Sequence, residues 1–558
     1  MTVVLAALFM SIGLVNLDFS RNWARGQWLR LAIGFPILLV YAYVEMPPLV
    51  FPQALVLLLF TFIPNTAYSL MLSARTWWIA RRVVSIRRLP SMPYLAGSIA
   101  LLAFAGVLMI APVIDASGLR DVPNVSIVNG LPPSADLQHI RVVPEEAAAF
   151  QGDKVIGQLG AYYAVGAYNI QVENGKLVWV APLEFRDAIK WATRHTSPGV
   201  VVVSAEMPDA PVDLRQRKPM RYIPSALLND NLYRHVYFRY GFEQILELTL
   251  QIDDNGDPQY LATLGRPTIG WTGHIVTAVV IVDPNSGAMQ RVPKAAFGTL
   301  PKWVKRVYPP DLALAYNDWF GEYVHGWWNA RLSERDVHLP ARAEVFGLLL
   351  AGDQFVWFVD HSSPSTRDTS MTGFTYMDTV SGKLTYYTAS AGTYNSIGAE
   401  RALASNPIIK QGRLIPTQPV LYNVSGQNTW VVPAVADTGK YQTLGLVQAS
   451  TGRVFVGNVS SGSPQDDVFA QYRAWLGDRT VAGVASGGRI QGVIDRVGAA
   501  GSRAYFTLTG RKGVFMIVDP ATPDATLSRP GDRVALRATL DAEGQYIVTE
   551  FKDESLHR

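Results

Sequence analysis

The sequence predicts an α+β fold in which an N-terminal bundle of about four transmembrane helices carries a large β-rich region. Three observations predict it. The apolar excess is concentrated in the first 115 residues, hairpin-like segments recur from about residue 150 onward, and the C-terminal segment has the strand pattern of a small barrel. A chain of 558 residues exceeds what one hydrophobic core usually organises, so several domains are expected.

Residues 1–115 contain four predominantly apolar runs of roughly the length that spans a hydrocarbon core, about 20 residues. The runs cover residues 2–19, 28–46, 54–72 and 94–114. The first run lacks the basic flank and small-residue cleavage site of a signal peptide, and three more runs follow it. We therefore interpret all four as membrane helices.

Arginines are distributed unevenly among the connections between these runs. They follow the first and third runs, whereas the connection after the second run, residues 45–53, has no Lys or Arg. The predicted topology-determining residues are Arg21, Arg25, Arg30, Arg75, Arg81, Arg82, Arg87 and Arg88. By the positive-inside rule, the N-terminus and everything after residue 115 lie outside the cytoplasm, in a multi-pass cell-membrane protein.

The predicted spans carry no ionisable residue at mid-depth, only Pro36 and the pair Pro64-Asn65 as kink candidates. An ion or proton path normally requires such residues. Because burying them in lipid is costly, ionisable residues inside a span usually mark such a path. A structural kink is therefore favoured over a broken transport helix, and an anchor or assembly role over transport.

Paired β-hairpins with Gly-containing turns recur along residues 150–460, and helical stretches separate the pairs. The turns are predicted at Asn255-Gly256, Asn285-Ser286-Gly287, Gly352-Asp353, Ser381-Gly382, Ser425-Gly426 and Thr451-Gly452, with a more degenerate one at Asn174-Gly175. The helical stretches are predicted at 222–232, 311–330, 396–405 and 464–477. Antiparallel sheets, each backed by a helix, are the expected architecture.

The segments VVIVDPNSGAMQRV, FTYMDTVSGKLTYY and LGLVQASTGRVFVG resemble the final strand pair of PepSY-type modules. With the order of the whole region, the chain resembles a family of bacterial membrane-anchored proteins with PepSY-like repeats and a terminal OB-like barrel. The resemblance implies placement in the cell envelope and no catalytic residues. The expected units are a first α+β module at 116–235, a second PepSY-like module at 236–335, and a third and fourth at 336–480.

Residues 481–558 are predicted to form five short strands with a turn at 530–532, a count and order that resemble an OB-fold. Some OB-folds bind nucleic acid through aromatic platforms in a basic groove. The candidates for such a platform are Arg503, Tyr505, Phe506, Arg511 and Lys512. We favour Tyr505 and Phe506 as one surface and one core residue, and an extracytoplasmic location disfavours nucleic acid further.

No familiar enzyme signature occurs in a convincing context, and the chain has no cysteine, so we expect neither a catalytic site nor a cofactor or metal. Two motifs leave alternatives. The run Asp360-His361-Ser362-Ser363 could suggest a hydrolase, but a polar loop after a strand is favoured. The acidic turn 253–257 superficially resembles a calcium loop, but its register fails and a hairpin turn is favoured.

The stretch 319–328 is the most aromatic in the chain and supplies the partner-binding candidates Trp319, Tyr323, Trp327 and Trp328. If exposed, these side chains would bind a partner or glycan. The helical spacing of Trp319, Tyr323 and Trp327 favours burial of most of them against a sheet.

The expected function is a non-enzymatic envelope protein that contacts the lipid bilayer and binds an envelope protein, a peptide or a cell-wall partner, with homo-oligomerisation left open. Three alternatives remain. They are a regulator of secreted or membrane proteases, suggested by the PepSY-like resemblance, a transport-associated subunit, and nucleic-acid capture by the barrel.

Overall fold

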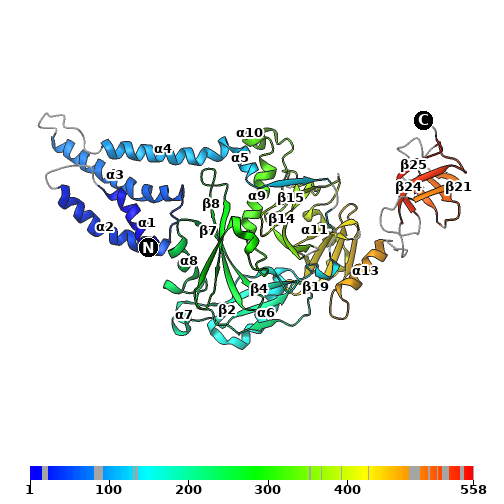
Figure 1. Cartoon of the computed structure of the whole chain (residues 1–558), viewed down its shortest axis with the longest axis horizontal. Coiled ribbons are helices and arrows are strands. Elements are labelled where there is room, and N and C mark those ends of the chain that lie inside the picture. The colour runs from blue at the N-terminus through cyan, green and yellow to red at the C-terminus, as the bar shows by residue number, and fades with distance from the viewer. Residues whose placement is uncertain are drawn as a thin grey trace.

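A computed structural model of the chain gives a mixed α+β fold, with the N-terminal helices at one end and sheets following them (Figure 1). It describes residues 1–558 except 16–22, 81–91, 130–131, 134–135, 351–352, 366, 391, 425, 477–489, 501–502, 512, 518–526, 541–545 and 557–558. The predicted α+β class is confirmed.

The N-terminal helices carry their apolar side chains largely on the outside. They are α1 (Thr2–Ser11), α2 (Trp23–Glu45), α3 (Gln53–Ala80) and α4 (Met92–Ile114). Their shared core is small and built on residues such as Ala6, Ala7 and Ala42, whereas Ile37 and Met109 are exposed. A helix of a water-soluble domain turns its apolar stripe inward, so this burial pattern is reversed.

Two helical segments in the described part of the chain are long and apolar enough to cross a membrane, Ala24–Glu45 and Ala96–Ile114. The apolar segments Thr2–Leu14 and Gln53–Tyr68 are shorter. The prediction of a bundle of about four transmembrane helices is therefore not supported by the described residues. The first predicted run ends in residues outside the described ones, and the long helix α3 has its described apolar part only up to Tyr68.

Pro64 and Asn65 lie inside α3, and Asn65 forms contacts with the neighbouring segments of the chain. Asn65 Nδ2 donates to the carbonyl of Gly13 at 2.9 Å, and Arg30 Nη1 donates to Asn65 Oδ1 at 3.0 Å. A Cβ on Gly13 would lie 2.2 Å from Thr61 Oγ1, so glycine lets α1 and α3 approach closely. This contact fits the structural interpretation of the Pro64-Asn65 pair.

Four sheets follow the helices. The first contains β2 (Tyr163–Val165), β3 (Asn169–Glu173), β4 (Lys176–Phe185), β5 (Val200–Ser204) and β6 (Asp213–Arg215). The second contains β7 (Gln244–Ile252), β8 (Pro258–Arg266), β9 (Ile275–Val282) and β10 (Met289–Pro293). Both are antiparallel.

The third sheet contains β11 (Leu339–Pro340), β12 (Phe346–Leu350), β13 (Gln354–Ser362), β14 (Gly373–Asp378) and β15 (Leu384–Thr388). It also takes in β1 (Val125–Val128), which pairs in parallel with β15. The fourth contains β16 (Ile415–Pro416), β17 (Val420–Val424), β18 (Gln427–Val435), β19 (Tyr441–Gln448) and β20 (Val454–Gly457). Neighbouring sheets share hydrophobic clusters, which join them into one packed body.

Short helices lie between and against the sheets. They are α5 (Ala116–Asp121), α6 (Glu145–Ile156), α7 (Ala188–Arg194), α8 (Leu232–Tyr240), α9 (Pro310–Glu322), α10 (Gly326–Trp328), α11 (Ser396–Ser405), α12 (Pro407–Gly412) and α13 (Gln465–Leu476). The prediction at 222–232 was wrong in position. Asn231 caps α8 by accepting from the amide of Arg234, so the helix begins there rather than at residue 222.

Each predicted hairpin turn joins two antiparallel strands, as expected. Gly352 and Ser425 themselves lie outside the described residues. In three turns the amide of a glycine with positive φ donates at 2.8–2.9 Å to the carbonyl four residues earlier. These turns run from Asp283 to Gly287, from Asp378 to Gly382, and from Gln448 to Gly452.

A tyrosine covers each of these three glycines. Tyr222, Tyr308 and Tyr394 each precede the helix that begins a sheet unit, α8, α9 or α11. Each donates its backbone amide at 2.8 Å to a carbonyl in the turn, and a Cβ on the glycine would lie 2.2–2.9 Å from the ring. We call this arrangement the turn clamp. It ties the start of each unit to its last hairpin.

Five further strands close into a barrel in the order β21-β22-β23-β25-β24. They are β21 (Ile490–Ala500), β22 (Arg503–Leu508), β23 (Phe515–Ile517), β24 (Arg533–Leu540) and β25 (Tyr546–Asp553). Phe506 is buried and stacks on Phe515 with ring centroids 5.4 Å apart, whereas Tyr505 is half-buried. The favoured interpretation of this pair is confirmed. Lys512 lies outside the described residues.

Two features of the turn clamp disfavour any side chain at position 382. The φ of Gly382 is +75°, and the ring of Tyr308 occupies the place of an added Cβ. We expect Gly382→Ala to lower the free energy of unfolding by about 2–4 kcal/mol, since strain and overpacking add. The matched control is Gly175→Ala, where φ is +77° but nothing lies within 4 Å of the added carbon. It should cost only about 1 kcal/mol. Equal losses in chemical unfolding of the two variants would contradict a role for the ring.

Candidate functional site at the junction of helices and sheets

The ends of the N-terminal helices that face the sheets are hydrogen-bonded to α8 and the residues around it. Thr2 Oγ1 donates to the carbonyl of Phe238 at 2.8 Å. In the connection between α2 and α3, the amide of Leu49 donates to the carbonyl of Gly241 at 2.7 Å. Backbone groups thus fix both the start of α1 and the connection 46–53 against the second sheet unit.

The end of α4 is held by the connection between β8 and β9. A Cβ on Gly270 would lie 2.1 Å from the carbonyl oxygen of Leu108, so this connection approaches the helix backbone directly. Asp115 then caps α5 by accepting from the amide of Gly118 at 3.1 Å, and Leu119 on α5 is buried. The chain that follows α4 is therefore packed against the sheet region through α5.

The aromatic stretch 319–328 lies at this junction but not on one helix. Trp319 is half-buried against Tyr316, with centroids 5.7 Å apart, and Tyr323 is also half-buried. Helix α9 ends at Glu322, and Gly326, with a φ of +82°, lies between this end and Trp327. The predicted helical spacing is therefore wrong for Trp327, and Trp328 is exposed.

Trp327 and Trp328 pack edge to face, 4.8 Å apart, beside the end of α4. A shallow pocket of about 410 Å³ separates these rings from the helix. It is lined by Val113, Ile114, Ala116, Ser117 and the segment 325–328. Two of the four predicted partner-binding aromatics therefore meet the apolar end of α4.

Buried His361 and half-buried His338 form a pair behind α9. His338 Nδ1 and His361 Nδ1 are 2.9 Å apart, and His361 Nε2 lies 2.8 Å from Asn317 Oδ1. Asn317 Oδ1 is an acceptor, because Asn317 Nδ2 donates to a backbone carbonyl. His361 must then carry its proton on Nε2 and accept through Nδ1 from His338. Both imidazoles are neutral in this arrangement.

Burial among aromatic rings keeps the pair neutral. His338 stacks on Tyr386 at 5.0 Å and meets Phe320 edge on at 5.2 Å. Burial, reinforced by the charge of Arg120 on α5, lowers the pKa of His338 to about 4. Burial likewise holds the pKa of His361 well below its usual range. The pair links α9 and β13 through neutral polar groups.

The run Asp360-His361-Ser362 ends strand β13, so the expected polar loop was wrong. Alternation along the strand sends neighbouring side chains to opposite faces. Asp360 accepts from the amide of Ser396 at 2.7 Å, away from the histidine pair, and Ser362 Oγ donates to the carbonyl of Ser370 at 2.8 Å. These residues do not assemble a triad.

The acidic turn 253–257 is the favoured hairpin turn. Asp253 accepts from the amides of Asn255 and Asp257 at 2.9 and 3.0 Å and from Gln259 Nε2 at 3.1 Å. Its carboxylate is thus used to close the turn. Within the described residues, no group of three or more His, Asp or Glu is placed to hold a metal.

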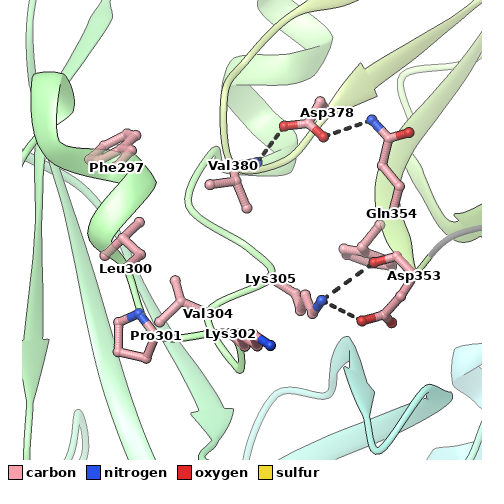
Figure 2. A pocket seen from close by; sticks show the side chains of 11 residues that line it. Phe297, Leu300, Pro301, Lys302, Val304, Lys305, Asp353, Gln354, Asp378 and Val380 are labelled. Atoms are coloured by element: carbon pink, nitrogen blue, oxygen red, sulfur yellow. Dashed lines mark hydrogen bonds and ion pairs between the residues drawn. The ribbon is translucent and has the colours of Figure 1, made fainter.

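A second pocket, of about 320 Å³, lies between the second and third sheet units (Figure 2). Lys305 Nζ donates to Asp353 Oδ2 at 2.5 Å, and Gln354 Nε2 donates to Asp378 Oδ2 at 2.9 Å. In Figure 2 these paired polar groups lie on the side of the pocket opposite Phe297. Such mutual pairing leaves them less suited to fixing a ligand.

The predicted topology residues are only partly described. Arg25 is exposed near the start of α2, and Arg30 donates to Asn65 as above. The side chain of Arg75 is not described, and Arg21, Arg81, Arg82, Arg87 and Arg88 lie outside the described residues.

No protein-family model matches the chain, and no curated protein matches its sequence. The junction itself therefore provides the evidence on function. Sequence reasoning missed the histidine pair because its members are 23 residues apart and only His361 belongs to a motif, the run beginning at Asp360. The signal in the sequence was chemical: His361 closely follows the apolar run 355–359.

Protonation of the histidine pair should destabilise the protein in mild acid. A histidine with a lowered folded pKa stabilises the fold fully above its unfolded pKa, near 6.5, and loses that contribution as the pH falls toward 4. The matched variant is His338→Asn, which retains a donor at the Nδ1 position but does not titrate. Between pH 7 and pH 4 the wild type should lose about 2–3 kcal/mol more stability than this variant.

Thermal unfolding of both proteins across this pH range checks the prediction. Asp318, whose pKa burial raises to about 6, titrates in the same range, and its contribution cancels in the comparison. Parallel loss of stability in the two proteins would show that His338 is not the titrating group.

Proposed function

We propose that the chain is an integral membrane protein whose helices anchor an extracytoplasmic, non-enzymatic binding or scaffold region of a cell-envelope assembly. The observation that carries the proposal is the junction. The start of α1, the connection 46–53 and the end of α4 all meet the sheet region, so consecutive helices run alternately toward it and away from it.

Four passes follow from this alternation if all the helices are embedded. The outward apolar surfaces of the helices support embedding, because exposed apolar area of this extent is costly in water. Arg25 lies at the end of α2 that is remote from the junction, where the positive-inside rule favours the cytoplasm. Both features support placing the sheets outside.

The chemistry of the described polar clusters supports binding rather than catalysis. The histidine pair is neutral and enclosed by rings, and the carboxylates of the turns accept backbone amides. Repeated units with shared cores provide a large, stiff surface, as expected for a scaffold. The resemblance to PepSY-type modules points in the same direction.

The topology can be tested by labelling single cysteines, because the chain contains none. Glu45→Cys and Ser450→Cys are exposed positions that should react with a membrane-impermeant maleimide added to intact cells. Ala24→Cys is the matched control and should react only after permeabilisation. Labelling of Ala24→Cys in intact cells, or protection of Ser450→Cys, would overturn the proposed orientation.

The scaffold role is tested by co-purification. The full-length protein, extracted in mild detergent from its native membrane, should retain a specific protein or cell-wall fragment identifiable by mass spectrometry. A solitary protein without a retained partner or self-association would count against the role, even if the topology were correct.

A further inference from the structure

Exposed apolar side chains lie around the junction on both sides of the helices. Their exposed fractions are 53% for Phe242, 57% for Leu228, 69% for Trp328, 70% for Met109, 73% for Ile114 and 76% for Leu332. We call this set the apolar rim. We propose that the apolar rim enters the outer leaflet of the bilayer that α4 crosses, so that the sheet region itself binds lipid at the boundary of acyl chains and headgroups.

The level at which the helices end supports this placement. The rings of Phe51 and Phe104 have centroids 6.1 Å apart, so the connection 46–53 lies level with Phe104 on α4. Helix α4 continues for ten more residues to Ile114, about 15 Å at 1.5 Å per residue. The apolar segment Ala96–Ile114 includes this extension. If the whole segment lies in hydrocarbon, the adjoining sheet region must reach the same depth.

The α4 side of the apolar rim carries the residues that membrane interfaces favour. Trp327 and Trp328 lie beside Val113 and Ile114, and tryptophan concentrates where acyl chains meet headgroups. Leu332 follows within one short helical segment and is the most exposed member. The exposed apolar surface of α4 therefore lies beside exposed apolar side chains of the sheet region, and the charged residues Asp115 and Arg331 flank them.

The opposite side of the apolar rim exposes a leucine in a strained backbone conformation. Leu228 has a φ of +53°, which is unfavourable for a branched side chain. Arg234 Nη1 donates to its carbonyl at 2.7 Å, while the guanidinium of Arg234 lies over the ring of Tyr43 on α2 at 4.5 Å. A residue of α8 thus fixes Leu228 next to the helices with its side chain uncovered. Lipid is the occupant that both sides share.

This inference rests on the proposed membrane location, and its test separates the two. The full-length protein is reconstituted in phosphatidylcholine nanodiscs with an environment-sensitive fluorophore on one introduced cysteine. The rim positions are Trp328→Cys and Leu332→Cys. Ile99→Cys, on α4, reports membrane embedding, and Ile408→Cys, comparably exposed on α12, reports water. The quencher is a lipid with a nitroxide near the headgroup end of its acyl chain.

Fluorescence at both rim positions should shift to the blue and be lost on adding the nitroxide lipid, whereas position 408 should keep its emission. Position 99 should be quenched by a lipid with a nitroxide deep in its acyl chain. If position 99 is quenched in this way but the rim positions are no more quenched than position 408, the proposed lipid contact of the apolar rim is overturned, while membrane insertion stands. A blue shift without lipid quenching would indicate a protein partner and also overturn the proposal. Loss of quenching at 99 itself would refute the membrane location.

Discussion

The second, third and fourth sheet units are each closed onto themselves, and the turn clamp provides that closure. A tyrosine at the start of the unit binds the last turn twice, through its backbone amide and through its ring on the glycine. An antiparallel hairpin without such a partner is only marginally stable in water. Each clamp positions the helix that follows its tyrosine, so the positions of α8, α9 and α11 depend on the three clamps. The junction with the N-terminal helices is built on two of these three, α8 and α9.

Side-chain chemistry varies at the clamp while the backbone geometry is kept. Asp283 and Asp378 accept turn amides with their carboxylates, whereas Gln448 stands at the same place in the fourth sheet. The glycine and the tyrosine remain in all three. The parts that tolerate no replacement are therefore those set by φ and by close packing, and the polar cap is exchangeable.

The sequence predicted local features well and long-range ones poorly. Every predicted hairpin turn joins two antiparallel strands, because Asn-Gly and Ser-Gly pairs between alternating strands encode their own geometry, but the turn at 436–440 between β18 and β19 was not predicted. The tyrosines were missed, since each lies about 58 to 74 residues from its glycine and pairs with it only through the fold. At the candidate site, Trp319 and Tyr323 followed helical spacing, but Gly326 broke it before Trp327. The number of helices long and apolar enough to cross a membrane was overestimated where only composition was available, and the module boundaries at 235 and 335 stay predictions.

The parallel pairing of β1 with β15 has a consequence for the order of assembly. Val125 follows α4 and α5 almost at once, yet its partner Leu384 is synthesised 259 positions later, since 384 − 125 = 259. A strand that emerges so early must wait, unpaired and next to the N-terminal helices, until most of the chain has been made. Folding through such distant contacts is slow, because the loop must close before the contact stabilises it. Biogenesis of this protein should therefore be most vulnerable to aggregation, and most dependent on a holding chaperone, in the interval before the third sheet is complete.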